Sequence, residues 1–257
     1  MSNLILSAKN VTKIYGLGTK HPVQALTDVS LDMYEGDFIC VMGPSGAGKS
    51  TFVNNLSTID MPTKGKVFIN NEEVRAMGEG EIGRFRYENL GFIFQEFNLL
   101  ESLTISENIA IPLSLANVDK EEVRTRIEKI ADRLDIKALL DKYPSECSGG
   151  QRQRAAIARA LVTQPKLIVA DEPTGNLDSK NSHEILELFK ELNDHDGVTI
   201  LMVTHDSMIA SYSHKLLYIK DGIIAETVER VGDMSQKDYF YKIVDINSEE
   251  SQKLFVD

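Results

Sequence analysis

The stretch GPSGAGKS at residues 43–50 decides the fold, because it fits the pattern G-x-x-x-x-G-K-[ST]. The apolar run DFICVM, residues 37–42, precedes it as a predicted strand, and a helical pattern begins at Lys49. Glycines let backbone N–H groups turn toward phosphates, Lys49 adds a positive charge, and Ser50 offers a hydroxyl to Mg²⁺. A glycine-rich turn without a ligand is the alternative, but the flanking strand and helix favour a nucleoside triphosphate site. The residues expected there are Gly43, Pro44, Ser45, Gly46, Ala47, Gly48, Lys49, Ser50 and Thr51.

Short apolar runs recur along the chain and alternate with helical patterns, as in βα units. They lie at residues 37–42, 89–94, 166–171, 198–204 and 215–220, and antiparallel pieces are indicated at 4–16, 29–36 and 66–74. Runs that are apolar on both faces are typical of buried parallel strands. A helical insertion is expected over about residues 97–164, where Val123, Ile127 and Ile130 recur at helical spacing. The prediction is an α/β fold with a mostly parallel sheet, an N-terminal antiparallel β subdomain and a helical insertion.

The stretch LIVADEP, residues 167–173, ends an apolar strand in two carboxylates. Such a strand delivers Asp171 and Glu172 to the carboxyl edge of the sheet, where open α/β sheets bind ligands. Beside a phosphate loop, Asp171 is suited to hold Mg²⁺ and Glu172 to orient or deprotonate an attacking water. His205 ends the next strand, in ILMVTHD, and could contact a γ-phosphate from the same edge. Two solvated carboxylates before Pro173 and a structural histidine are the alternatives.

Composition and charge narrow the function classes. The chain has 257 residues, 42% of them hydrophobic, with a formal net charge of −11 and a pI near 5.0. This acidic balance argues against binding nucleic acid by broad phosphate neutralisation. Cys40 and Cys147 lie far apart, so neither a zinc site nor a disulfide framework is indicated. Without a signal-peptide pattern or an apolar run of about 18 residues, we expect a soluble intracellular protein whose membrane role comes through a partner.

A second glycine-rich stretch, ECSGGQRQR at residues 146–154, opens a basic helix. Ser148, Gly149 and Gly150 leave backbone N–H groups open at the start of this helix, which makes an anion site without a phosphate of its own. An ordinary helix cap, followed by arginines on a solvated face, is the alternative. One phosphate loop suffices for one nucleotide, so the second stretch indicates either a second phosphate or a second copy of the chain.

The ordered set of motifs resembles the ATP-binding cassette ATPases, the nucleotide-binding subunits of ABC transporters. The set comprises the phosphate loop, Gln95 after GFIF, CSGGQ, LIVADEPTGNLD and His205, and it spans nearly the whole chain. The resemblance implies a RecA-like P-loop NTPase core, ATP and Mg²⁺ as cofactors, and a head-to-tail homodimer. It implies further that Ser148 and Gly150 of one copy clamp the γ-phosphate held by the phosphate loop of the other.

The resemblance also assigns roles to individual residues. Tyr15 matches the aromatic residue that stacks on adenine, and Asp178 matches the loop that crosses to the partner's site. The catalytic residues it implies are Glu172, His205 and Gln95. The metal ligands it implies are Ser50, Gln95 and Asp171. The signature residues it places at the nucleotide are Ser148, Gly149, Gly150 and Gln151. The groove that receives a coupling helix of an integral membrane permease is implied at Phe97, Leu99, Leu100 and Leu103, whose alternative role is the core of the insertion.

Two further stretches narrow the resemblance within the family. YGLGTKHPVQAL, residues 15–26, resembles the lipoprotein-release and macrolide-efflux branch, and the tail SQKDYFYKIVDI most resembles bacitracin-type peptide-antibiotic resistance ATPases. This implies an ATPase at the cytoplasmic face of the membrane, with a permease partner and, through it, a sensor histidine kinase. The alternative is a non-transporting ATPase that transmits mechanical force, as in lipoprotein release or cell division.

The chain is expected to divide near its C-terminal end. Residues 1–228 are the expected ATPase domain, and residues 229–257 the expected amphipathic extension. In the extension, one apolar helical face is expected to pack on the chain's own body or on a partner, and it consists of Tyr239, Phe240, Ile243 and Val244.

Overall fold

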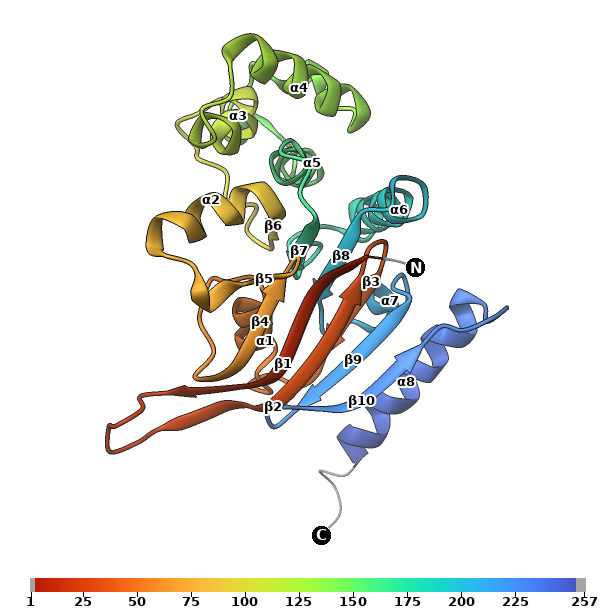
Figure 1. Cartoon of the computed structure of the whole chain (residues 1–257). Coiled ribbons are helices and arrows are strands. Elements are labelled where there is room, and N and C mark those ends of the chain that lie inside the picture. Colours follow the sequence, from red (N-terminus) through yellow and green to blue (C-terminus); the bar gives the residue numbers. More distant parts are fainter. Residues whose placement is uncertain (1–2, 253–257) are drawn as a thin grey trace.

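The computed structural model describes residues 3–252, and its larger sheet has six strands (Figure 1). These are β3 (Phe38–Met42), β6 (Leu90–Phe94), β7 (Leu167–Asp171), β8 (Thr199–Val203), β9 (Lys215–Lys220) and β10 (Ile223–Glu229). They lie in the order β10-β9-β3-β8-β7-β6, and every neighbouring pair is parallel except β9 and β10. The prediction of a mostly parallel sheet is confirmed.

A smaller antiparallel sheet covers the N-terminal part of the chain. Its strands are β1 (Leu4–Tyr15), β2 (Val23–Tyr34), β4 (Lys64–Ile69) and β5 (Glu72–Glu73), in the order β2-β1-β4-β5. The expected start of the second strand at residue 29 is wrong, because β2 begins at Val23 and pairs it with Tyr15. Residues 16–22 are therefore a hairpin loop, and the hairpin projects from the body of the molecule (Figure 1).

Eight α-helices and three short 3₁₀ turns lie within the described residues. The helices are α1 (Lys49–Leu56), α2 (Glu79–Asn89), α3 (Ile105–Leu115), α4 (Lys120–Arg133), α5 (Gly149–Leu161), α6 (Ser179–Asp196), α7 (Ser207–Ala210) and α8 (Gln236–Gln252). The 3₁₀ turns are η1 (Val74–Ala76), η2 (Lys137–Leu139) and η3 (Pro144–Glu146). Helices α3, α4 and α5 gather at one end of the molecule, beyond α2 and the edge strand β6 (Figure 1). None of the helices within residues 3–252 is both long and apolar enough to cross a bilayer.

The central strands of the larger sheet are buried on both faces, which explains why their sequences are continuously apolar. All five residues of β3 and all five of β8 are buried. One apolar cluster contains Phe38 and Met202 together with side chains of α3, α4, α5 and α6, and a second contains Val41 and Val203 with side chains of α1 and the smaller sheet. Alternate residues of one strand thus serve two different cores.

The C-terminal helix α8 packs on the chain's own body. Tyr239 and Ile243 are fully buried against Cys40, Met42 and Tyr218, and the Tyr239 hydroxyl donates a 3.2 Å hydrogen bond to the Val228 carbonyl. Of the two possibilities left open by the sequence, contact with the body is the one realised. Phe240 and Val244, on the same expected face, are only half-buried, and the end of the extension, residues 253–257, lies outside the described residues.

Candidate active site

Parallel pairing brings the ends of three strands to one edge of the larger sheet. Asp171, the last residue of β7, is in register with Phe94 on β6 and with Val203 on β8. The next residues in each strand therefore leave the sheet side by side, which places Gln95 and Glu172 at this edge. The carboxyl edge is the side of the sheet where α/β proteins bind ligands.

The phosphate loop connects β3 to α1 and needs glycine at two positions. A Cβ on Gly43, whose φ is 148°, would lie 1.9 Å from the Ile219 carbonyl oxygen. A Cβ on Gly48, at φ 100°, would lie 2.5 Å from the Ala25 carbonyl oxygen. Gly48 is also the N-cap of α1 and provides no capping side chain. The first-turn amide N–H groups of α1 are therefore left to bind an anion.

Lys49 folds back onto the loop that precedes it. Its Nζ donates to the carbonyl oxygens of Gly43, at 2.8 Å, and Pro44, at 3.0 Å. Burial lowers the pKa of the ammonium, and the negative charges of Glu172 and Asp171 act in the opposite direction. The charge thus sits inside the loop, close to where the phosphates of a nucleotide would bind.

Asp171 presents a half-buried carboxylate to the same space. Burial raises its pKa, the neighbouring charge of Glu172 raises it further, and Lys49 opposes both. Within residues 3–252 no hydrogen bond or ion pair reaches this carboxylate. A carboxylate that is partly desolvated and has no protein partner is suited to bind a cation.

Glu172 is held by both its backbone and its side chain. Its φ of 46° is left-handed, its N–H donates to the Val203 carbonyl at 3.0 Å, and its own carbonyl accepts from the Gly175 N–H at 3.0 Å. One carboxylate oxygen lies 2.8 Å from His205 Nδ1, and the other accepts from the Thr204 hydroxyl at 3.4 Å. Because an ionised carboxylate only accepts, His205 donates the proton of this contact from Nδ1.

Gln95 is exposed and lies against the loop that follows Glu172. A Cβ on Gly175 would be 2.7 Å from the Gln95 Nε2, and the Gln95 carbonyl accepts a 3.0 Å hydrogen bond from the Asn176 side chain. The structure thus joins Gln95 to the segment carrying Glu172.

Tyr15 ends β1 with an accessible ring. Its side chain is 41% exposed, and its hydroxyl donates to Asp60 Oδ2 at 2.8 Å. Lys13 Nζ lies 4.9 Å from the ring centroid. The tyrosine is therefore fixed at its tip and keeps aromatic surface available for stacking.

The signature stretch begins α5 with a reciprocal cap. The Ser148 hydroxyl accepts from the Gln151 N–H at 3.3 Å, and the Gln151 side chain accepts from the Ser148 N–H at 2.9 Å. Within the described residues, the N–H groups of Gly149 and Gly150 have no acceptor. The helix cap and the open anion site, which the sequence presents as alternatives, therefore occur together. No hydrogen bond or ion pair of residues 3–252 joins this stretch to the phosphate loop.

The first turn of α6 lies close to the signature helix. Asp178 caps α6 by accepting from the Asn181 N–H at 2.9 Å and from its side-chain amide at 2.7 Å, and these bonds hold the pKa of Asp178 below its usual range. Asn181 also faces Gly150, where a Cβ would lie 2.3 Å from its Oδ1. Nothing in the sequence singles out Asn181, because this contact depends on two helices far apart along the chain.

The arginines of α5 do not form the solvated face considered as an alternative. Arg159 is half-buried and donates to the carbonyl oxygens of Phe97, at 2.8 Å, and Asn98. Burial lowers the pKa of its guanidinium. The guanidinium of Arg152 lies 5.1 Å from the centroid of the Phe97 ring. These arginines tie α5 to the segment that follows Gln95.

An apolar groove lies between α2, β6, α3 and α5, and its volume is about 530 Å³. The rings of Phe92 and Phe94 stack at 5.9 Å along β6, and Leu115 is 68% exposed. The residues implied for the permease groove, Phe97, Leu99, Leu100 and Leu103, do not line it. Phe97 is buried, whereas Leu100 is exposed outside the groove.

The phosphate loop, the paired carboxylates and the mostly parallel sheet define the chain as a P-loop ATPase. A sequence profile of the ABC transporter family matches residues 26–175. ABC transporter ATP-binding protein YxdL of Bacillus subtilis is 45% identical over 248 residues, or 96% of this chain and 95% of that protein. Bacitracin export ATP-binding protein BceA of Halalkalibacterium halodurans is 42% identical over 241 residues, or 93% of this chain and 94% of that protein.

A solved structure agrees with these relatives. The ATP-binding cassette MJ0796 of Methanocaldococcus jannaschii, a dimer in a post-hydrolysis state bound to ADP and Pi, superposes with a TM-score of 0.80. The identity is 39%, and the alignment covers 89% of this chain and 100% of that one. The chain therefore belongs to the ABC transporter family. It is an ATP-binding subunit and an ATPase, with ATP and Mg²⁺ as its ligands.

The chemistry of the site fits Mg²⁺. This ion keeps several waters and takes only one or two protein oxygens beside those of the phosphates. Ser50 lies exposed in the first turn of α1, and the Asp171 carboxylate has no partner among the described residues. When bound, the ion neutralises charge that develops on the phosphate oxygens.

Proposed function

We propose that two copies of this chain close around two ATP molecules and use the closure to drive a membrane permease. The observation that carries the proposal is the signature helix: within residues 3–252 its first two N–H groups have no acceptor, and no hydrogen bond or ion pair links it to the chain's own phosphate loop. A phosphate presented by a second copy would supply that acceptor. Each ATP would then stabilise the closed pair, and its hydrolysis would release it.

Within one site, we assign the phosphates to the loop residues Gly43, Pro44, Ser45, Gly46, Ala47, Gly48, Lys49, Ser50 and Thr51. Lys49 leaves the carbonyl groups it now contacts and pairs with the outer phosphates. Asp171, Ser50 and Gln95 would hold the metal ion. Tyr15 would stack on the adenine, and Asp178, at the start of α6, would face the partner's site.

Hydrolysis needs a proton acceptor for the attacking water. As the water oxygen bonds to the γ-phosphorus, the bond to the bridging oxygen of ADP breaks, and Glu172 takes the proton released by the water. His205 orients Glu172 through the 2.8 Å contact between its Nδ1 and the carboxylate. The Thr204 hydroxyl supports the other carboxylate oxygen.

Two variants test this proposal. Glu172→Gln keeps the shape of the side chain but removes its basicity, so it should abolish turnover and trap a dimer with bound ATP, as measured by gel filtration. Ser148→Arg should prevent dimerisation in the Glu172→Gln background while each monomer still binds ATP. A Glu172→Gln protein that stays monomeric with ATP, or a Ser148→Arg monomer that loses ATP affinity, would contradict the arrangement across two chains.

The apolar groove between α2 and α3 is the proposed binding site for a segment of the permease. Phe92, Phe94 and Leu115 would bury apolar surface there, and such a groove accepts an amphipathic helix. This would place the ATPase at the cytoplasmic face of the membrane. Leu115→Asp should release the chain from its permease in a pull-down without changing ATP affinity, and an intact complex would count against this binding site.

The proposed process is resistance to, or export of, peptide antibiotics of the bacitracin or lantibiotic type. It is supported by the similarity to BceA of Halalkalibacterium halodurans, whose name describes bacitracin export, over 93% of this chain. Deleting the gene should sensitise cells to bacitracin, and unchanged sensitivity would favour force transmission without transport. A sensor histidine kinase acting through the permease stays a prediction.

The proposed division places the ATPase domain in residues 1–228 and an extension in residues 229–257. Its support is that β10 ends at Glu229 and α8 begins only at Gln236, and that α8 then packs on α7, β3 and β9 as a separate apolar cluster. A chain truncated after residue 228 should therefore still bind ATP but unfold at lower urea concentration. Loss of ATP binding in a folded truncated chain would contradict this boundary.

A further inference from the structure

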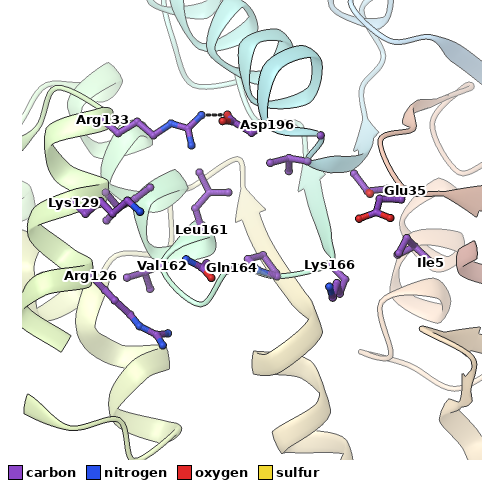
Figure 2. A pocket seen from close by; sticks show the side chains of 15 residues that line it. Ile5, Glu35, Arg126, Lys129, Arg133, Leu161, Val162, Gln164, Lys166 and Asp196 are labelled. Atoms are coloured by element: carbon purple, nitrogen blue, oxygen red, sulfur yellow. Dashed lines mark ion pairs between the residues drawn. The ribbon is translucent and has the colours of Figure 1, made fainter. Parts of the chain in front are cut away.

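A second cavity lies at the opposite ends of the strands from the nucleotide site. Its volume is about 330 Å³, and it opens where β7 and β8 begin, between α4, the end of α5 and the end of α6 (Figure 2). The catalytic carboxylates stand where β7 ends, so the two sites are on opposite edges of one sheet. Ligand pockets start at about 300 Å³, which makes this cavity large enough for a small molecule.

Cationic side chains gather around this cavity. Arg126, Lys129 and Arg133 follow one face of α4 at spacings of three and four residues, and Lys166 precedes β7. Figure 2 shows the three side chains of α4 along one side of the cavity. Only two acidic residues line it, although the chain as a whole has a net charge of −11. The cavity is therefore an electropositive place on an acidic protein.

Both acidic residues already have partners. Asp196, at the end of α6, pairs with Arg133 and so joins α4 to the core (Figure 2). Glu35 accepts a 2.9 Å hydrogen bond from the Asn3 side chain and lies beside Ile5, across the cavity from α4 (Figure 2).

Among residues 3–252, two of the cations lack an anionic partner. Arg126 pairs with Glu122 on its own helix. Within the described part of the chain, no ion pair involves Lys129 or Lys166, which are both exposed. These two ammonium groups come from α4 and from the start of β7, so one ligand between them would touch two separate parts of the molecule.

The rest of the lining is apolar and sits between the charged groups. Ile130, Leu161, Val162 and Pro165 contribute to it, and Figure 2 shows Leu161 and Val162 between α4 and Lys166. A free inorganic anion would gain nothing from these side chains. A ligand with an apolar body beside its charge would gain from both.

We propose that this cavity binds a small organic phosphate with an aromatic or aliphatic body. The body lies on Leu161 and Pro165 between α4 and Lys166, and the positive field of Lys129 and Lys166 attracts the phosphate, with Arg126 at the edge. A bound phosphate of this kind bridges α4 to the sheet next to the Arg133–Asp196 pair, and it does so independently of ATP.

The test uses the full chain with its nucleotide site filled by saturating Mg·ADP. Anilinonaphthalene sulfonate, a fluorescent anion with an aromatic body, is the probe, and phenyl phosphate is the competitor. The double variant Lys129→Glu, Lys166→Glu should weaken probe binding about tenfold, because it exchanges two attractive charges for repulsive ones. Phenyl phosphate should displace the probe from the unaltered protein.

A matched double variant, Lys120→Glu with Lys237→Glu, changes the net charge equally at exposed positions on α4 and α8. It should bind the probe as the unaltered protein does, and both variants should keep their affinity for Mg·ADP, which reports an intact fold. Equal probe binding by all three proteins would overturn the proposal. Equal loss in both variants would overturn it too, since attraction by net charge alone would then explain the binding.

Discussion

The contact between Gly150 and Asn181 makes a prediction whose size follows from the geometry. In Gly150→Ala the new Cβ would lie 2.3 Å from Asn181 Oδ1 and 2.9 Å from its Cγ. Overpacking of this kind costs about 1–3 kcal/mol. Replacing a helical glycine by alanine gains about 1 kcal/mol, so the single variant should lose between about 0 and 2 kcal/mol of stability.

Removing the Asn181 side chain should reverse the sign of the change in stability that Gly150→Ala causes. In Asn181→Ala the nearest remaining atom of residue 181 is its Cβ, at 3.4 Å from the new methyl group, which is an ordinary contact. On this background Gly150→Ala should stabilise the protein by up to about 1 kcal/mol, since only the helix propensity remains. Asn181→Ala alone gives up the side-chain hydrogen bond to the exposed Asp178.

Urea unfolding of the unaltered protein, the two single variants and the double variant measures the coupling free energy between positions 150 and 181. This coupling should reach about 1–3 kcal/mol. Gly149→Ala is the control, because its Cβ would meet the flexible end of Leu177 at 3.2 Å and should not couple to residue 181. If Gly150→Ala has the same effect with and without the Asn181 side chain, the two helices do not meet as described.

Lys49→Ala should abolish ATP binding in a fluorescent-nucleotide titration, because the loop loses its only ammonium; retained affinity would speak against its role. His205→Ala should lower kcat by about 10²–10⁴-fold with little change in ATP affinity, and an unaltered kcat would refute the contact with Glu172. Asp171→Asn should stabilise the free protein at pH 7 while reducing ATPase activity. Because burial raises the pKa of Asp171, the stability of the unaltered protein should increase as the pH falls through the folded pKa. If the unaltered protein and Asp171→Asn give the same urea unfolding curves at every pH from 7 to 4, this expectation is wrong. Tyr239→Ala should cost about 3–5 kcal/mol and Tyr239→Phe about 1 kcal/mol in urea unfolding; equal losses would show that ring burial is not the main contribution.

Local patterns were enough to predict the parallel strands and the phosphate loop. The runs ending at Met42 and Asp171 are buried on both faces, so hydrophobicity alone marks them. Glycines of the phosphate loop follow from a fixed spacing that backbone sterics require. Gln95, by contrast, was assigned only by the family resemblance, because its place beside Glu172 depends on the pairing of β6 with β7.

Contacts between distant segments were not predictable in this way. Arg159 looks like a surface residue of a basic helix, and only the fold shows that it holds the carbonyl oxygens of Phe97 and Asn98. The start of β2 was misplaced because the glycines at 16 and 18 and the proline at 22 suggest a long loop rather than a hairpin. The hydrogen bond from Thr204 to Glu172 depends on the pairing of two strands, so the sequence around Thr204 alone does not predict it.

The shared register of β6, β7 and β8 limits how this chain can change during evolution. Losing or gaining one residue inside any of these strands would rotate its final side chain to the opposite face and break the alignment of Phe94, Asp171 and Val203. Length variation among descendants is therefore confined to the connections between the strands. The far ends of these strands, where Lys166 and Thr199 lie, are separated from the carboxylates of the nucleotide site by the length of the strands. That edge of the sheet can therefore acquire a new ligand specificity while the ATPase site at the other edge stays unchanged.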